Sequence, residues 1–357
     1  NHQGKRLSEM RIKLLSALIT LIALSQTIAG GKTPVQIHGQ LRVEGNKIVD
    51  QHGDPTQLRG MSFFWSQWQG QYYNKRAVNW LVKDWKVTVV RAAMGAKHVE
   101  SESGYMYDGS EKYKVRAVVD AAIKNGIYVI IDWHDHYAHE NADAAQSFFE
   151  EMARRYGEHP NVIYEIFNEP IKASWSEVVK PYSERIVSAI RKIDPDNLIV
   201  IGTPHWCQDV DEAAKDPLEG ENLAYSLHFY AATHGLDIQE KAQFAIDKGL
   251  ALFVTEFGTC LASGDGYLDS LGTEQWFEFM DKHKLSWCNW SIADKDETAS
   301  ALVPGARWFG RWDYGDLTRS GRLIRAKLRK YAGFEENLKP PKKKEKKKPW
   351  FQVKPLR

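Results

Sequence analysis

Residues 162–170 read Val-Ile-Tyr-Glu-Ile-Phe-Asn-Glu-Pro, and residues 250–258 read Leu-Ala-Leu-Phe-Val-Thr-Glu-Phe-Gly. Both stretches are apolar runs of the kind that forms a strand buried on both faces of a parallel sheet. Each run leads to a glutamate, Glu169 in the first and Glu256 in the second. A charge at the end of a buried strand is costly without a partner, so two charges in matching positions indicate a shared polar site.

The same kind of apolar run occurs eight times, and helix-like stretches separate the runs. The runs lie near residues 58–64, 87–92, 127–133, 162–168, 197–201, 223–230, 250–256 and 285–291. The clearest helical patterns cover residues 111–125, 143–157, 176–193 and 318–331. Strand–helix alternation repeated eight times predicts an α/β protein with a (β/α)8 TIM barrel. Turn signals within residues 40–57 predict a small N-terminal β-hairpin at the barrel floor.

Composition divides the chain into four parts. Residues 10–29 have a positively charged start, an apolar core and small residues near a cleavage position, so we expect a signal peptide and a secreted, extracellular protein. Residues 1–9 precede the first methionine and are interpreted as an upstream artefact. Residues 30–333 are expected to form the barrel. Residues 334–357 are expected to form a basic, Lys- and Pro-rich disordered tail or linker.

The distribution of charge limits the partners. Residues 334–357 carry a net charge of +6, residues 1–29 carry +3 and the whole chain carries +2, so residues 30–333 carry −7. An acidic barrel does not fit a nucleic-acid partner. The apolar core of the signal segment is too short for stable membrane insertion, and we expect a monomer. The three cysteines allow at most one disulfide, which the sequence does not assign: Cys207, Cys260 and Cys288.

The chemistry of a (β/α)8 barrel lies at the carboxyl ends of its strands. Six of the eight runs end in polar, titratable or aromatic groups: Arg91, Asp132 to His134, Asn168 with Glu169, His228 to Tyr230, Glu256 and Trp290. Taken singly, each has a structural explanation as an ion-pair partner, barrel filling or core packing. Two carboxylates at strand ends together supply what hydrolysis of a glycosidic bond needs. One donates a proton to the leaving oxygen, and the other attacks or stabilises the anomeric carbon.

A metal site is the alternative raised by His134-Asp135-His136. A His-x-His sequence after a barrel strand binds divalent metals in amidohydrolase-type enzymes, but that site also needs ligands after later strands. Run four offers Glu169 instead, and runs five and eight end in Gly202-Thr203 and Trp290-Ser291. We therefore predict no metal and no cofactor, and we expect His134 to form hydrogen bonds near the sugar or Glu169.

Taken together, these motifs resemble glycoside hydrolase family 5. The matching segments are residues 58–62, 90–93, 132–134, 165–170, 202–204, 208–211, 228–231, 254–259, 289–291, 294–297 and 300–302. Within the family, the sequence is similar to the secreted endo-β-1,4-glucanases (cellulases) of bacteria and plant-parasitic nematodes. The resemblance implies that residues 30–333 are a catalytic barrel. It implies hydrolysis of internal β-1,4 bonds of a cellulose-type β-glucan with retention, by a two-glutamate double displacement.

The resemblance also implies a role for each site residue. Glu169 is the implied acid/base and Glu256 the implied nucleophile. The implied substrate contacts are Asn168 with the 2-hydroxyl, Arg91 and Tyr230 around the nucleophile, His134 and His228 in the cleavage subsite, Trp290 as its floor, and Lys295 and Glu297 toward the non-reducing end. Lys295 and Glu297 favour glucan. A β-mannanase, a xylanase, a mixed-linkage glucanase and, in a different class, a non-catalytic carbohydrate-binding barrel stay open as alternatives.

Overall fold

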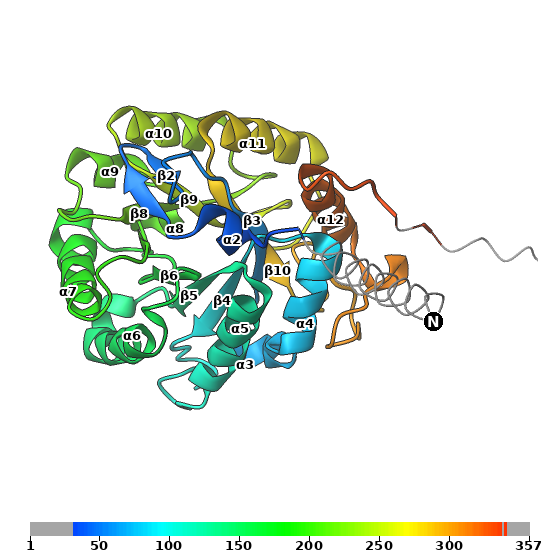
Figure 1. Cartoon of the computed structure of the whole chain (residues 1–357), viewed down its shortest axis with the longest axis horizontal. Helices are drawn as coiled ribbons and strands as arrows, with labels where there is room; N and C mark the ends of the chain where they lie inside the picture. Colours follow the sequence, from blue (N-terminus) through cyan, green and yellow to red (C-terminus); the bar gives the residue numbers. More distant parts are fainter. Residues whose placement is uncertain (1–30, 338, 341–357) are drawn as a thin grey trace, which may run out of the picture.

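Eight parallel strands form a closed barrel in the computed structural model, which describes residues 31–337 and 339–340 (Figure 1). In barrel order the strands are β10 (Ser286–Ile292), β3 (Arg59–Phe63), β4 (Val89–Gly95), β5 (Tyr128–His134), β6 (Val162–Glu165), β7 (Ile199–Ile201), β8 (Leu223–Tyr230) and β9 (Leu252–Gly258). The predicted (β/α)8 barrel is confirmed. The expectations for residues 1–9 and 10–29, and those for most of residues 334–357, fall outside the described residues.

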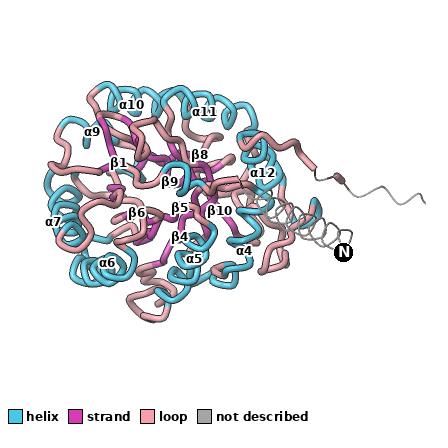
Figure 2. Tube along the Cα trace, in the orientation of Figure 1, coloured by secondary structure: helices cyan, strands magenta, loops and turns pink. Residues whose placement is uncertain are grey.

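Helices surround this barrel (Figure 2). The α-helices are α2 (Pro34–His38), α3 (Ser66–Gln69), α4 (Lys75–Trp80), α5 (Glu111–Asn125), α6 (Ala142–Tyr156), α7 (Lys180–Arg191), α8 (Pro204–Cys207), α9 (Val210–Lys215), α10 (Leu236–Asp247), α11 (Ser270–His283) and α12 (Arg319–Tyr331). The shorter turns are η1 (Gly70–Tyr72), η2 (Leu81–Trp85), η3 (Ala138–Asn141), η4 (Trp175–Val179) and η5 (Tyr314–Asp316). Among the described helices, none is long and apolar enough to cross a membrane.

The predicted N-terminal hairpin is present and closes one end of the barrel. Strands β1 (Arg42–Glu44) and β2 (Lys47–Val49) pair antiparallel. Leu41 and Ile48 belong to the same buried cluster as Leu58, Tyr128 and Phe253, which come from the barrel wall. Burying apolar side chains of the hairpin against the barrel interior fixes the floor in place.

Strand alternation places polar groups above this apolar floor. On β4, Val90 and Ala92 join the cluster between barrel and helices, whereas Val89 joins the floor cluster inside the barrel. Because side chains alternate across a strand, Arg91 points inward, one layer above Val89. Arg91 is fully buried there, beneath the open end of the barrel.

The helix predicted over residues 176–193 is divided into two parts. The π-type turn η4 comes first, and the Lys180 N–H bonds to the Trp175 carbonyl, five residues earlier. Pro181 follows within the first turn of α7 and has no backbone N–H to continue the α-helical pattern. The division changes the local hydrogen bonding but leaves the strand–helix alternation intact.

Contacts with the barrel continue beyond the predicted boundary at residue 333. Phe334 lies 4.1 Å from the Lys86 ammonium, which sits over its ring. Arg325 of α12 donates to the side chains of Glu336 and, at 2.6 Å, Asn337. The first residues of the predicted tail therefore pack on the barrel surface.

Candidate active site

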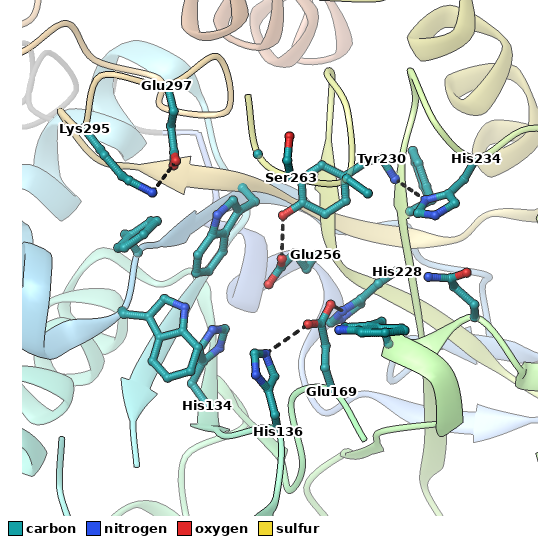
Figure 3. Close-up of a pocket in the computed structure, with 18 of the residues that line it drawn as sticks. His134, His136, Glu169, His228, Tyr230, His234, Glu256, Ser263, Lys295 and Glu297 are labelled. Carbon is teal, nitrogen blue, oxygen red and sulfur yellow. Dashed lines mark hydrogen bonds and ion pairs between the residues drawn. The ribbon is translucent and has the colours of Figure 1, made fainter. Parts of the chain in front are cut away.

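A pocket opens at the carboxyl ends of the strands and brings most of the predicted site residues together (Figure 3). Eight of the ten line it: His134, Glu169, His228, Tyr230, Glu256, Trp290, Lys295 and Glu297. Arg91 and Asn168 do not line the pocket and are buried beneath it. Sequence positions spread over more than 200 residues thus converge because every parallel strand delivers its carboxyl end to the same mouth.

Glu256 is held between a cation and a phenol. Arg91 Nη1 donates to Glu256 Oε2 at 2.9 Å, and the Tyr230 hydroxyl donates to Oε1 at 2.9 Å. Burial and the nearby Glu169 raise the pKa of Glu256, whereas Arg91 opposes that shift. Both carboxylate oxygens accept hydrogen bonds from fixed donors, and we therefore assign the ionised form, which a nucleophile requires.

A β-bulge in β9 aims Glu256 at the pocket. Ser226 pairs with Phe253 and His228 pairs with Glu256, so β9 has one more residue than β8 over this interval. Such an extra residue lets two consecutive side chains reach the same side of a sheet. Thr255 and Glu256 both contact groups inside the barrel as a result.

Glu169 lies between two histidines. His228 Nδ1 is 2.9 Å from Glu169 Oε1, and His136 Nε2 is 3.3 Å from Oε2. Burial opposes ionisation of Glu169, but the bonds from His136 and His228 outweigh it and lower its pKa to about 2. Burial likewise opposes protonation of His228, but the nearby carboxylates of Glu165, at 3.8 Å, and Glu169, at 2.9 Å, raise its pKa to about 9. The protonation states of Glu169 and His228 are therefore linked through their direct contact.

Arg91 is the cation at the centre of the site. Its guanidinium contacts three carboxylates: Asp132 at 3.0 Å, Glu165 at 2.6 Å and Glu256 at 2.9 Å. Burial opposes its charge, but these three carboxylates raise the pKa of Arg91 well above its ordinary value. A buried cation is stable only with such partners, so Arg91 is permanently charged and fixed in orientation.

Asn168 has one satisfied and one unsatisfied end. Its Oδ1 accepts from Arg91 Nη2 at 2.6 Å, which fixes the orientation of the amide. Its Nδ2 is buried and has no hydrogen-bond partner among the residues that the structure describes. Because buried donors are rarely left unpaired, this amide is arranged to donate to a bound ligand.

His134 lines the pocket but does not contact Glu169; of the histidines in residues 134–136, His136 makes that contact. His134 Nδ1 lies 2.7 Å from Asp132 Oδ2, and its ring stacks on Trp290 with an interplanar angle of 4°. Burial and the Arg91 charge hold the pKa of His134 well below its usual range, so its ring is neutral. Strand β5 ends at His134, and the chain after it carries His136 toward Glu169.

The far rim of the pocket carries the remaining predicted residues. Lys295 Nζ is 2.5 Å from Glu297 Oε2, and Lys295 also lies over the Phe64 ring. Phe64 in turn packs against Trp290, with ring centroids 5.0 Å apart. Aromatic faces beside a charged pair form a surface suited to sugar rings, which present apolar C–H faces and hydroxyl edges.

Among the described residues, Glu169, His228 and Glu256 form one group with metal-ligand chemistry, because their donor atoms lie within 4.8 Å of one another. Both ring nitrogens of His228 already have protein partners, Glu169 and Thr255. Glu256 faces the Arg91 cation. These contacts suit proton transfer between side chains better than metal coordination.

A family comparison decides the class of protein. The family model for cellulase (glycosyl hydrolase family 5) matches residues 49–296. The chain belongs to glycosyl hydrolase family 5. It is therefore a glycoside hydrolase by family, and its barrel, with both strand-end glutamates in one pocket, agrees with that assignment.

Individual relatives match most of the chain. Endoglucanase Z of Dickeya dadantii is 45% identical over 312 residues, which is 86% of this chain and 69% of that protein. Endoglucanase A of Evansella cellulosilytica is 46% identical over 289 residues, 79% of this chain and 58% of that protein. The catalytic domain of Thermobifida fusca endoglucanase Cel5A, solved in complex with cellotetraose, is 34% identical with a TM-score of 0.79, covering 84% of this chain and 100% of that domain.

Sequence reasoning missed several residues of this family 5 site. Glu165 and Thr255 lie beneath the pocket, and a polar residue inside an apolar run was the available signal. Trp65 and Trp206 form parts of the wall. Trp206 was difficult to predict as a wall residue. Its backbone has a φ of 54°, a left-handed conformation that non-glycine residues rarely adopt.

All three cysteines are free and buried. Cys207 donates to the Asn168 carbonyl at 3.0 Å and so ties the turn that carries Trp206 to the loop that follows β6. Cys260 lies in the same buried cluster as Ala299.

Proposed function

We propose that this chain is an endo-β-1,4-glucanase that hydrolyses internal bonds of a cellulose-type β-glucan with retention of configuration. One observation supports the proposal above all. An oxygen of Glu169 and an oxygen of Glu256 lie within 4.8 Å of each other. Carboxyl groups about 5–5.5 Å apart are typical of retaining enzymes, whereas inverting enzymes separate them by about 6.5–9.5 Å to admit a water.

In the first half-reaction, Glu256 attacks the anomeric carbon while Glu169 protonates the leaving oxygen. The bond between the anomeric carbon and the leaving oxygen breaks, and its electron pair stays with that oxygen. Arg91 and Tyr230 hold the two Glu256 oxygens, so the carboxylate is oriented before attack. Asn168 Nδ2 supplies a donor for the sugar's 2-hydroxyl, an interaction that strengthens in the transition state.

In the second half-reaction, water hydrolyses the glycosyl ester on Glu256. Glu169 now removes a proton from the water, whose oxygen bonds to the anomeric carbon as the ester bond breaks. The two inversions give net retention. His136 and His228 both contact Glu169 and keep its two oxygens in place through the change of role.

The substrate assignment rests on the relatives and on the pocket wall. The curated relatives are named endoglucanases, and the Thermobifida fusca domain was solved with cellotetraose. Trp65, Trp206 and Trp290 offer flat faces along the pocket of this chain. A non-catalytic binding barrel is disfavoured, because both glutamates and the cation that orients one of them are present.

We also infer secretion from the signal-like composition of residues 10–29, which lie outside the described residues. This inference is tested by expressing the full chain in a secretion-competent host and sequencing the N-terminus of the extracellular product. Recovery of the intact chain inside the cell alone would contradict it.

The test of the substrate assignment is a comparison of polymers. Reducing ends and viscosity are measured on carboxymethylcellulose, mannan, xylan and mixed-linkage glucan with the same enzyme preparation. We expect carboxymethylcellulose to lose viscosity early, while few reducing ends have formed, because internal bonds are cleaved. Faster hydrolysis of mannan or xylan than of any glucan would assign the chain to one of the alternative activities.

A further inference from the structure

Glu165 lies directly beneath the catalytic pair and takes no part in the proposed bond-breaking steps. Its side chain is fully buried on β6, four residues before Glu169, and does not line the pocket. Oε2 accepts from Arg91 Nε at 2.6 Å. Oε1 accepts from the Thr255 hydroxyl at 2.6 Å and from the Ser226 hydroxyl at 3.1 Å. A buried carboxylate with partners on two sides couples the groups that it touches.

The single hydrogen of the Thr255 hydroxyl decides the state of His228. Burial opposes ionisation of Glu165, but Arg91 and His228 lower its pKa to about 2, so its oxygens only accept. Thr255 therefore donates to Glu165, and its oxygen accepts from His228 Nε2, 2.8 Å away, and can also accept from the Ser226 hydroxyl, 2.9 Å away. His228 Nε2 consequently carries a hydrogen wherever Glu165 is ionised.

This constraint leaves one proton to be shared at the other ring nitrogen. His228 Nδ1 faces Glu169 Oε1 at 2.9 Å, and the proton between them lies on the nitrogen or on the oxygen. The first arrangement is an imidazolium beside a carboxylate, and the second is a neutral ring beside a carboxylic acid. Both hold the same number of protons, so His228 and Glu169 titrate as one pair.

We infer that Glu165 is a positioning residue that keeps the catalytic proton in the His228–Glu169 pair. Through Thr255 it fixes the tautomer with hydrogen on Nε2 and stabilises the positive charge of His228. Through Arg91 it holds the cation that orients Glu256. This inference rests on the proposed function and deepens it, because it assigns the proton that the acid/base step uses.

Other titratable groups face Glu165 from the neighbouring strands. Asp132 of β5 pairs with Glu165 in register, and burial and adjacent carboxylates raise the pKa of Asp132 despite its contact with Arg91. The Cys288 thiol of β10 stays neutral, because burial raises its pKa far above its ordinary value. Glu165 differs from both groups, because Arg91 and His228 lower its pKa, and its negative charge favours the charged form of His228.

The proton path balances over the reaction. In glycosylation, the proton passes from His228 Nδ1 to Glu169 and from Glu169 to the leaving oxygen, so His228 becomes neutral. Glu256 loses its negative charge in the same step by forming the ester, and one of the anions that raised the pKa of His228 is removed. In hydrolysis of the ester, Glu169 takes the proton from water and returns it to His228, and Glu256 is again a carboxylate.

The test uses the full chain with Thr255→Val, which keeps the shape but removes the acceptor for His228 Nε2. The rate constant kcat/KM for a soluble glucan is measured against pH, because its alkaline limb reports the essential acid of the free enzyme. We expect the alkaline limb to move to lower pH by about one unit or more, since His228 loses the contact that favours its charged form. Thr255→Ser, which restores the hydroxyl, should return the limb to its wild-type position.

Glu165→Gln is the second variant that tests the inference. An amide can donate to Thr255, and the Thr255 hydroxyl can then turn toward His228 Nε2, which would place the ring hydrogen on Nδ1. We expect the alkaline limb to move to lower pH in this variant too. Nitrogen NMR of the wild-type chain, labelled at histidine, should show His228 with hydrogen on Nε2 and with a pKa well above that of an ordinary histidine. This readout does not depend on the variants folding.

An alkaline limb that stays in place in Thr255→Val, with activity retained, would overturn the inference and leave the glucanase proposal intact. A wild-type His228 that lacks hydrogen on Nε2 at neutral pH would also overturn it. Failure of the wild-type chain to cleave any glucan would instead reject the proposed function itself. The two failures are therefore distinguishable.

Discussion

Arg91 is the residue on which the electrostatics of the site depend. It is fully buried and balances three carboxylates from three different strands, one of which is Glu256. Removing one partner of a buried ion pair costs about 3–5 kcal/mol, because the charges left behind lose their compensation. The same cation therefore supports both the fold and the orientation of the proposed nucleophile.

Replacing Arg91 with methionine should affect stability and the pH profile together. We expect a loss of about 3–5 kcal/mol at pH 7. Without the cation, the lowered folded-state pKa of Glu165 rises, and the already raised pKa values of Asp132 and Glu256 rise further, so the loss is smaller near pH 4 and grows as pH rises. The acid limb of activity should move to higher pH, because Glu256 must be ionised to attack. Urea unfolding at pH 4 and pH 7 measures the first effect, and equal losses at both values would contradict it.

Replacing Glu169 or Glu256 with alanine should impair turnover in different ways. Glu256→Ala should lose turnover and recover it with azide, giving an α-linked product, because the small anion occupies the space of the missing carboxylate. Glu169→Ala should lose about 10²–10⁴-fold on polymer but much less on substrates with activated leaving groups, which do not need a proton. Full activity of either variant on polymer would show that the assignment of roles is wrong.

Asn168 offers a test of substrate positioning. Its Nδ2, which has no partner among the described residues, should donate to the sugar's 2-hydroxyl. Asn168→Ala should therefore lower kcat/KM by a larger factor than the factor by which it raises KM. The matched control is a substrate that lacks the 2-hydroxyl at the cleaved sugar. The variant and the wild-type enzyme should hydrolyse that substrate at more similar rates. An undiminished effect of the substitution on the deoxy substrate would place the role of Asn168 elsewhere.

At the scale of elements, strand periodicity explains what could be predicted. The apolar runs that contain Glu169 and Glu256 identified β6 and β9, and strand ends in a parallel barrel meet by topology. The bulge that turns both Thr255 and Glu256 inward could not be predicted, because it depends on pairing with β8. The choice of His136 over His134 as the partner of Glu169 likewise depends on how the chain leaves β5.

The segment after α12 is the element whose role is tested by truncation. The sequence predicted a tail from residue 334, but contacts continue to Asn337, and one of their partners, Arg325, is fully buried. A variant ending at residue 333 should lose about 1–3 kcal/mol, because buried donors lose their acceptors. A loss of this size lowers Tm by up to about 2–4 °C per kcal/mol, the range for domains of about 150–250 residues, and differential scanning calorimetry measures it. Arg329 loses an acceptor too, the Glu335 carbonyl.

A variant ending at residue 340 is the matched control for this truncation. It retains every described contact of the segment, so its Tm and its rate on soluble glucan should equal those of the full chain. Equal Tm values for the two truncations would show that residues 334–337 add no stability. A large drop for the longer variant would show that residues beyond 340 contribute to the fold.

At the scale of the whole molecule, the barrel separates stability from chemistry. The hairpin and the apolar floor cluster fill one end, and the polar network opens at the other. Charged groups are concentrated where a ligand can pair with them, which is why the buried polar residues of the strands lie beneath the mouth. The acidic barrel of net −7 is consistent with a neutral polysaccharide substrate rather than a polyanion.

Retention is the central claim, and the configuration of the first product tests it most directly. Proton NMR of cellohexaose hydrolysis, recorded before mutarotation, distinguishes the two anomers at the newly formed reducing end. One oxygen of Glu169 and one oxygen of Glu256 lie within 4.8 Å of each other, which is closer than the separation of about 6.5–9.5 Å typical of inverting enzymes. We predict that the β-anomer forms first and that the α-anomer grows later by mutarotation. An initial α-anomer would contradict the double displacement and the roles assigned to both glutamates.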